Sequence, residues 1–192
     1  MVKLDYFEEI ESLKVFYKLK EIIRYKGINN ESVAEHVYSS IVLAKYFLKK
    51  VDENLDENII FNLILYHDIV EIFAGDVCLG DDKKLENKKE NESNAINTLK
   101  EKISNELFEE FKYYFDEFEK NKTREAKFAN AIDKIDPYFE CWSKPEITKK
   151  LKISAKQLKG KKEKYFKEFD VIYDFYIYLT DYFKKNNYLV ED

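Results

Sequence analysis

The stretch LYHDIVEIFAGDV, at residues 65–77, places a histidine directly before an aspartate and two more acidic side chains shortly after them. The pair is His67 and Asp68, and Glu71 and Asp76 follow. Imidazole nitrogens and carboxylate oxygens together bind first-row divalent ions, and further carboxylates can move protons to or from water. The stretch therefore predicts part of a metal site, if other elements bring further ligands to it.

The other histidine of the chain, His36, lies in the first turn of an expected helix. Ser32 and Glu35 fit a capping box, which is typical of a helix start. His36 then falls near the mouth of the helix, where a site can open. The alternative is a histidine that is simply hydrogen-bonded in the core. Acidic residues flank both histidines, which favours a shared metal site.

A further candidate ligand, Asp133, lies in the segment TREAKFANAIDKIDPYFECW among apolar neighbours. A carboxylate on such a face is costly unless it is paired or binds a metal. The alternative is a surface charge cluster of Asp133, Lys134 and Asp136. Pro137 lacks a backbone donor, so we expect it to kink or interrupt this helix.

Together these residues make a mixed nitrogen and oxygen set: His36, His67, Asp68 and Asp133. Such a set suits one divalent ion of Mn, Fe, Co, Ni or Zn better than Ca or Mg. Glu71 and Asp76 then remain as carboxylates that can orient or deprotonate a water, or protonate a leaving oxygen. The alternatives are a loop cap for Asp76 and a solvated helix position for Glu71.

The elements that must position these residues are expected to be helices. Only four glycines and two prolines occur, which leaves few strand and turn signals and favours an all-α fold. We expect helices at about residues 4–25, 32–50, 56–73, 86–103, 105–120, 122–142 and 161–186.

Three of these helices carry informative patterns. In the helix at 56–73, apolar residues, His67 and Glu71 recur along one face, and Gly75 is expected to end the helix. The helix at 4–25 has an apolar stripe. The helix at 161–186 has an aromatic stripe, which favours either core or a dimer face over a ligand site.

The composition of the chain excludes several classes of protein. With 192 residues, 45% hydrophobic and 37% charged, we expect one soluble globular domain. The net charge of −5 argues against a nucleic-acid partner. The absence of a long apolar run argues against a membrane partner, and we see no signal-peptide core. Cys78 and Cys141 are too few for a disulfide framework or a thiolate zinc site, and a cytoplasmic protein is expected.

Three motifs, ESVAEH (31–36), HDIVEIFAGD (67–76) and AIDKID (131–136), resemble those of the HD-domain metal-dependent phosphohydrolases. The closest similarity is to the 5′-deoxynucleotidase branch, which acts on nucleoside monophosphates, and it spans about residues 10 to 145. The resemblance implies an HD-domain helical bundle, which we expect to cover residues 1–192 as one domain. It also implies one divalent ion held by His36, His67, Asp68 and Asp133, with Glu71 and Asp76 as catalytic carboxylates.

The resemblance also assigns the substrate side of the site. Arg24 matches the arginine that contacts the substrate phosphate in the family, and a guanidinium suits phosphate oxygens. The alternative, preferred without the resemblance, is that Arg24 is a surface residue at a helix end. Tyr25 stands where some relatives have a tryptophan near the sugar, so base and sugar preference stay open. Lysines at 83–89 can reach a phosphate or be solvated, and the C-terminal forty residues match nothing known to us.

We therefore expect a metal-dependent enzyme that removes the 5′ phosphate from ribo- or deoxyribonucleoside monophosphates. One alternative is an HD-type hydrolase of another small phosphorylated metabolite. Another is a non-catalytic module that binds nucleotide or metal. A di-iron, oxygen-using relative is disfavoured, because no histidine remains after His36 and His67. Relatives are often dimers, so a homodimer is also expected.

Overall fold

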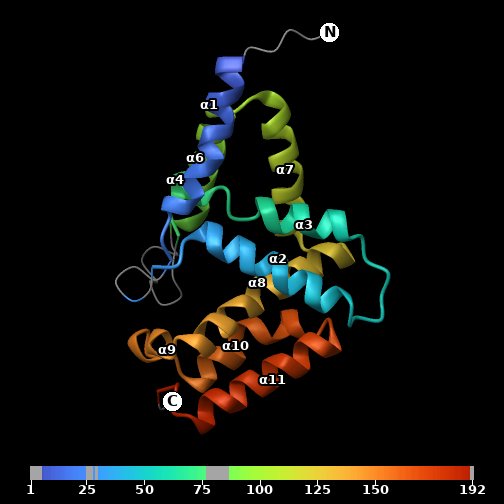
Figure 1. Ribbon diagram of the computed structural model, residues 1–192, viewed down its shortest axis with the longest axis vertical. Coiled ribbons are helices and arrows are strands. Elements are labelled where there is room, and N and C mark those ends of the chain that lie inside the picture. The colour runs from blue at the N-terminus through green and yellow to red at the C-terminus, as the bar shows by residue number, and fades with distance from the viewer. Residues whose placement is uncertain (1–5, 25–27, 29, 77–86, 191–192) are drawn as a thin grey trace.

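The structure of the chain is a computed structural model that describes residues 6–24, 28, 30–76 and 87–190. Within these residues the secondary structure consists of helices and two isolated β-bridges, without strands, so the predicted all-α class is confirmed. Figure 1 shows their arrangement. The helices are α1 (Tyr6–Tyr17), η1 (Lys18–Glu21), α2 (Val33–Leu48), α3 (Glu57–Tyr66), α4 (Glu71–Ala74), α6 (Lys88–Lys102), α7 (Asn105–Lys120), α8 (Arg124–Ser143), α9 (Glu146–Lys150), α10 (Ala155–Phe166) and α11 (Asp170–Lys185).

Helix α8 is the centre of the molecule. It packs against α2, α3, α7, α10 and α11, so it is covered on several sides. Phe128, Ile132 and Ile135 are fully buried along it. Because neighbouring helices cover it, polar residues of its middle part, such as Asp133 and Asp136, are buried together with the apolar ones. Its position fixes the place of every acidic residue that it carries.

Helix α2 begins as the sequence predicts. The Ser32 hydroxyl accepts a hydrogen bond from the Glu35 backbone at 3.2 Å, and the Ser32 backbone donates to the Glu35 carboxylate at 2.7 Å. This reciprocal pair satisfies two of the free amides at the start of the helix. His36 therefore has a fixed position one residue beyond the box, and its side chain is fully buried.

The prediction of one continuous helix at 56–73 is wrong. Helix α3 ends at Tyr66, residues 67–70 form turns, and α4 follows. Ile69 and Glu71 donate backbone hydrogen bonds to carbonyls three residues back, at 3.3 and 3.0 Å, in place of four. This tighter winding rotates the chain by more than the α-helical angle per residue. Gly75, at φ 75°, ends α4 as expected.

The expected boundaries at both ends of the chain also need correction. The helix expected at 4–25 is α1 followed by the short 3-10 helix η1, which ends at Glu21 because Ile22 is extended and Ile23 forms a bridge with Ser32. The helix expected at 161–186 is two helices, α10 and α11, separated by an extended Phe169 whose ring packs on Phe128 at 5.2 Å. Burial of that ring holds the break in place.

Pro137 lies inside α8, which continues through it, so the prediction of an interrupted helix is wrong. Proline cannot donate to the carbonyl four residues before it, which removes one helical hydrogen bond. Packing compensates, because the neighbouring Tyr138 is buried against Phe166 and Tyr176.

We predict that Phe47→Ala destabilises the fold strongly and that Tyr38→Ala, on the same helix, does not. Phe47 is fully buried, with its ring 5.1 Å from that of Phe175, so truncation leaves a cavity and should cost about 3–5 kcal/mol. Tyr38 is 72% exposed, and its removal should change stability by less than about 0.5 kcal/mol. Urea denaturation monitored by circular dichroism measures both. Equal midpoints for the two variants would contradict this account of the core.

Candidate metal centre

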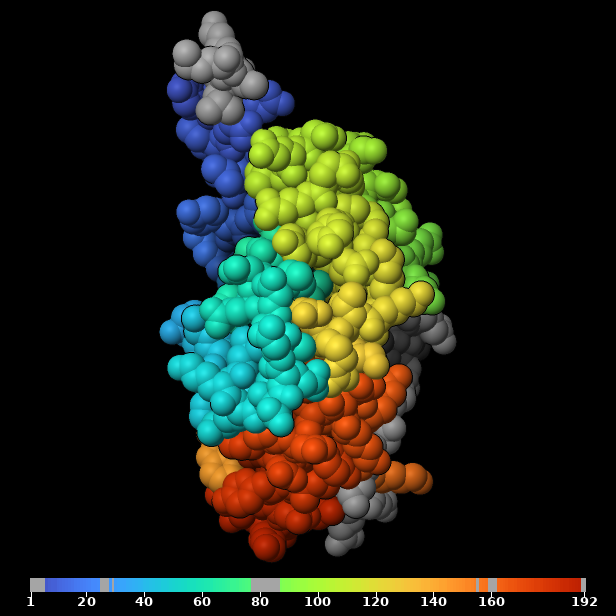
Figure 2. All heavy atoms as spheres, turned by 90° about the vertical axis from the view of Figure 1, so that its right-hand side faces the viewer, coloured from blue at the N-terminus to red at the C-terminus, as the bar shows by residue number. Residues whose placement is uncertain are grey.

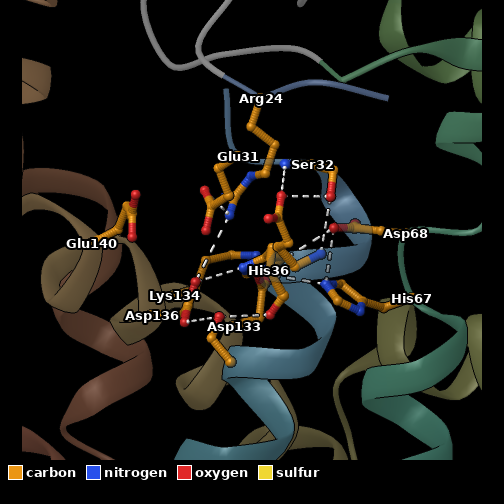
Figure 3. A network of polar contacts seen from close by, with 12 residues as sticks. Arg24, Glu31, Ser32, His36, His67, Asp68, Asp133, Lys134, Asp136 and Glu140 are labelled. Carbon is orange, nitrogen blue, oxygen red and sulfur yellow. Dashed lines mark hydrogen bonds and ion pairs between the residues drawn. The ribbon is translucent and has the colours of Figure 1, made fainter. Parts of the chain in front are cut away.

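Three separate segments bring the expected ligands to one place. His36 comes from α2, His67 and Asp68 from the turn after α3, and Asp133 from α8 (Figure 3). One ligand atom each of His36, His67 and Asp133 lies within 4.8 Å of the other two. Asp68 Oδ2 is 3.1 Å from His67 Nε2 and 3.8 Å from His36 Nε2. The four side chains thus converge on one point.

The orientation of both imidazoles fits a metal site. His67 Nδ1 donates to the Ile64 backbone carbonyl at 2.7 Å, and His36 Nδ1 donates to Asp136 Oδ2 at 2.6 Å. Oxygen acceptors at Nδ1 leave both Nε2 atoms directed at the shared point. Metal-binding histidines are held in this way, with the second nitrogen donating to a carbonyl or carboxylate. His67 Nε2 is buried without a hydrogen-bond partner, which is costly in the absence of a cation.

The electrostatics of the cluster also favour a cation. Burial opposes charge on all four groups, but the carboxylates of Asp68 and Asp133 raise the pKa of His67 well above its usual value. Burial by itself would raise the pKa of Asp133. The charge of Lys134 and the contacts with the two histidines outweigh burial and hold that pKa well below its usual range. Close charges in a medium of low dielectric are strongly coupled. A divalent ion could replace the protons on the imidazoles.

Lys134 binds the side of Asp133 that faces away from the histidines. Its ammonium contacts Asp133 Oδ2, while Oδ1 lies 3.2 Å from His36 Nε2 and 3.6 Å from His67 Nε2. The lysine therefore fixes the carboxylate so that one oxygen stays directed at the histidines. The alternative of a surface charge cluster is wrong, because Asp133 is 8% exposed and Asp136 is 2% exposed.

The two expected catalytic carboxylates lie beside this cluster. Burial, together with the charges of Asp68 and Asp76, raises the pKa of Glu71 to about 9, and Arg24 and His67 work in the opposite direction. Burial also raises the pKa of Asp76, and Asp68 adds to it. Glu71 Oε2 is buried without a hydrogen-bond partner. The readings of Glu71 as a solvated residue and Asp76 as a mere loop cap therefore fit the structure poorly.

Arg24 lies on the segment that leads into α2. Its backbone amide donates to Glu31 at 2.8 Å, and its guanidinium donates to the Glu31 carboxylate at 3.3 Å. The side chain is 12% exposed, and its charge acts on Glu71 and Asp76. Arg24 is thus not a solvated residue at a helix end, and it lies close enough to Glu71 and Asp76 for its charge to lower their pKa.

The remaining substrate-side candidates are placed only in part. Tyr25, Lys83 and Lys84 lie outside the residues that the structure describes. Lys88, at the start of α6, lines a small cavity with Glu71 and pairs with Glu92 at 3.3 Å. Its ammonium thus has a carboxylate partner, and a role of Lys88 in binding phosphate stays a prediction.

From the sequence alone, Asp136 was assigned no role beyond a possible charge cluster, whereas the structure places it in contact with His36. The sequence did contain a signal for this contact, because Asp136 follows Asp133 by three residues and therefore lies on the same face of the helix. Ser39, which donates to Asp136 Oδ1 at 2.7 Å, was also missed. It lies one turn after His36 on α2.

Comparison with protein families agrees with this geometry. A family model described as HD domain matches residues 16–172. The chain belongs to the HD domain family. A solved structure of an HD-domain protein from Listeria innocua, described as a phosphohydrolase, superimposes with a TM-score of 0.58 at 22% identity, covering 90% of this chain and 84% of that one. This likeness shows the shared fold.

Other relatives of this HD domain protein extend the comparison. The 5′-deoxynucleotidase HDDC2 of Bos taurus is 29% identical over 132 residues, which are 66% of this chain and 63% of that protein. The match thus spans less than two thirds of that relative. A predicted metal-dependent phosphohydrolase from Magnetospirillum magnetotacticum covers both chains fully, with a TM-score of 0.81 at 22% identity. These matches support the helical fold along the whole chain.

We predict that Asp68→Ala abolishes tight binding of a divalent transition ion. The variant loses the carboxylate beside both Nε2 atoms, so affinity should fall more than the roughly 10–100-fold that loss of an outer-sphere partner causes. Titration calorimetry with Mn²⁺ or Co²⁺ measures the affinity and should give a single ion per wild-type chain. Asp52→Ala, at an exposed position, is the control and should bind as the wild type does. Unchanged affinity of the Asp68 variant would exclude this residue as a ligand.

Proposed function

We propose that the protein is a metal-dependent phosphomonoesterase that removes the 5′ phosphate from nucleoside monophosphates. The observation that carries the proposal is the convergence of two imidazoles and two aspartates near Arg24 and two further, partly buried carboxylates. A site that only stored a metal would not need Glu71 and Asp76. The relatives described as 5′-deoxynucleotidases support a nucleoside monophosphate as substrate.

His36, His67, Asp68 and Asp133 would hold one divalent ion of Mn, Fe, Co, Ni or Zn. When bound, such an ion lowers the pKa of a water molecule and neutralises charge on phosphate oxygens. The mixed nitrogen and oxygen donors suit these metals better than Mg or Ca.

Arg24 would bind the substrate phosphate. Its guanidinium is largely buried but lies close enough to Glu71 and Asp76 for its charge to lower their pKa, so it supplies local positive charge in a chain of net charge −5. A planar guanidinium can donate two hydrogen bonds to one phosphate group. The carboxylates of Glu31 and Asp136 lie 3.3 and 3.8 Å from its Nη1 atom and help to hold it.

Glu71 and Asp76 would divide the proton transfers of hydrolysis. A carboxyl group whose pKa is raised to about 9 carries its proton at neutral pH and can donate it to the leaving 5′ oxygen. A cation bound at the neighbouring histidines would bring that pKa back toward neutrality. The second carboxylate would orient the attacking water in line with the leaving group.

We predict that the metal-loaded protein releases phosphate from a panel of ribo- and deoxyribonucleoside monophosphates, and that Glu71→Gln slows this turnover. Loss of one acid–base group should lower kcat about 100-fold or more, while metal affinity stays near that of the wild type. The malachite-green assay measures phosphate release, and calorimetry measures metal affinity. Glu57→Gln, on the exposed surface of α3, is the control. Full activity of the Glu71 variant would contradict its role, and absent activity on every monophosphate would contradict the function.

We also propose that residues 1–192 form one HD domain, including the α10 and α11 region that the sequence left unassigned. Phe183 and Tyr176 of α11 pack around Tyr138 of α8, so the C-terminal helices share the core of the site-bearing helix. The aromatic stripe of α11 is thus mainly core. Location in the cytoplasm and absence of a nucleic-acid partner stay predictions. Among the described residues, no helix is long and apolar enough to cross a membrane.

A homodimer is proposed through α1 in place of α11. Large apolar side chains of α1 are half exposed or more, and Figure 2 shows this helix (blue) projecting beyond the body of the molecule. They are Tyr6, Phe7, Ile10, Leu13 and Tyr17. A contiguous apolar face of this kind marks an interaction surface.

We predict that the wild-type protein has twice the mass of one chain in solution, and that the double variant Ile10→Glu, Leu13→Glu is monomeric. Two buried charges in the dimer contact would be too costly to retain. Light scattering coupled to size exclusion measures the mass. Tyr178→Glu, at an exposed position of α11, is the control that should stay dimeric. A monomeric wild type would exclude the dimer, and a monomeric Tyr178 variant would move the contact to α11.

A further inference from the structure

Asp136 is a buried carboxylate one helical turn beyond Asp133 on α8. It is 2% exposed, and its two oxygens have different partners. Oδ1 accepts a hydrogen bond from the Ser39 hydroxyl at 2.7 Å, and Oδ2 accepts one from His36 Nδ1 at 2.6 Å. A carboxylate buried this deeply needs such partners, because burial of an unpaired charge is very costly.

The imidazole of His36 is therefore held between two residues of a single turn of α8. Asp133 lies at its Nε2, 3.2 Å away, and Asp136 lies at its Nδ1 (Figure 3). The ring is fully buried, so both nitrogens depend on protein partners for hydrogen bonds. A carboxylate can only accept, so the short contact with Asp136 requires a hydrogen on Nδ1. With an ion bound between Nε2 and Asp133, Nε2 would then offer its lone pair to that ion.

The partners of Asp136 hold its carboxylate in place. The Arg24 guanidinium lies 3.8 Å from Oδ2, next to His36 on the same oxygen. Ser39 comes from the helix that carries His36, and its hydroxyl also lies 3.0 Å from the His36 carbonyl. The carboxylate is thus connected to α2, to α8 and to the segment of Arg24 at once.

We propose that Asp136 is a positioning residue that fixes the tautomer and ring orientation of His36, so that Nε2 is available to a divalent ion. The inference rests on the metal site of the proposed function and not on its substrate. Asp136 itself touches neither the ion nor a phosphate. Carboxylate partners of this kind also increase the basicity of the imidazole and its affinity for metal.

The first test is the affinity for Zn²⁺, measured by competition with a chromophoric chelator in wild type, Asp136→Asn and Ser39→Ala. The Asn variant keeps the size of the side chain but loses its charge, and its affinity should fall about 10-fold or more. Ser39→Ala leaves the Asp136 carboxylate in place and removes its hydrogen bond at Oδ1, along with the hydroxyl contact to the His36 carbonyl, so its affinity should lie between the other two. Wild-type affinity in both variants would overturn the proposal. If the Asn variant does not fold, the Ser39 variant alone decides in the same way.

The second test is the imidazole NMR spectrum of the zinc-loaded protein, which contains only two histidines and therefore two ring systems. In the wild type, the Nδ1 proton of His36 should be observed and shifted far downfield by its short hydrogen bond to Asp136. In Asp136→Asn, the nitrogen and proton signals of His36 should move strongly. Those of His67, whose Nδ1 donates to the Ile64 carbonyl, should stay, so His67 is an internal control.

A general loss of structure would move the signals of both rings, whereas loss of positioning moves one. Unmoved His36 signals, or equal shifts of both rings, would overturn the role of Asp136. Neither measurement contains substrate. Absent phosphatase activity with these zinc results would therefore contradict the proposed reaction while leaving Asp136 as the positioning residue of His36.

Discussion

The contact between α2 and α8 at His36 is the constraint on which the rest of the site depends. Each ring nitrogen of this buried imidazole meets an aspartate of α8, at 3.2 Å for Asp133 and 2.6 Å for Asp136. These contacts require α2 to cross α8 at one register, because a shift along either helix would leave a buried nitrogen or carboxylate unpaired. The capping box at Ser32 determines where α2 begins. The buried apolar residues of α8 keep α8 in the core.

The site concentrates acidic groups where water is scarce. Asp68, Glu71, Asp76 and Asp133 influence one another's pKa, and the raised pKa of Glu71 and Asp76 reflects that repulsion together with burial. The charge of Lys134 offsets part of it at Asp133, and the charge of Arg24 offsets part of it at Glu71 and Asp76. A core that tolerates such a cluster is expected where a cation is bound, because a divalent ion relieves the repulsion more effectively than protons do.

The chain departs from regular helix after α3, where it contributes His67 and Asp68 to this cluster. A continuous helix would leave adjacent His67 and Asp68 about 100° apart on its surface. The side chains of the two residues nevertheless converge at the end of α3, where Asp68 Oδ2 lies 3.1 Å from His67 Nε2. Glu71 follows the turn at residues 67–70, at the start of α4, and its Oε2 atom is buried. The His67 ring packs 4.8 Å from that of Phe118, so α7 helps to fix this orientation.

The sequence by itself determined the helical class, the start of α2 and the residues that meet at the centre, because periodicity, capping and rare histidines are local signals. It could not determine the turn at 67–70, the division into α10 and α11, or the exposed stripe of α1. Propensity there favours continuous helix, and contacts from distant segments, such as Phe128 on Phe169, override it. The role of Asp136 was likewise decided only by tertiary structure. Its partner His36 lies 100 residues away, and no local pattern distinguishes a buried acceptor from a surface charge.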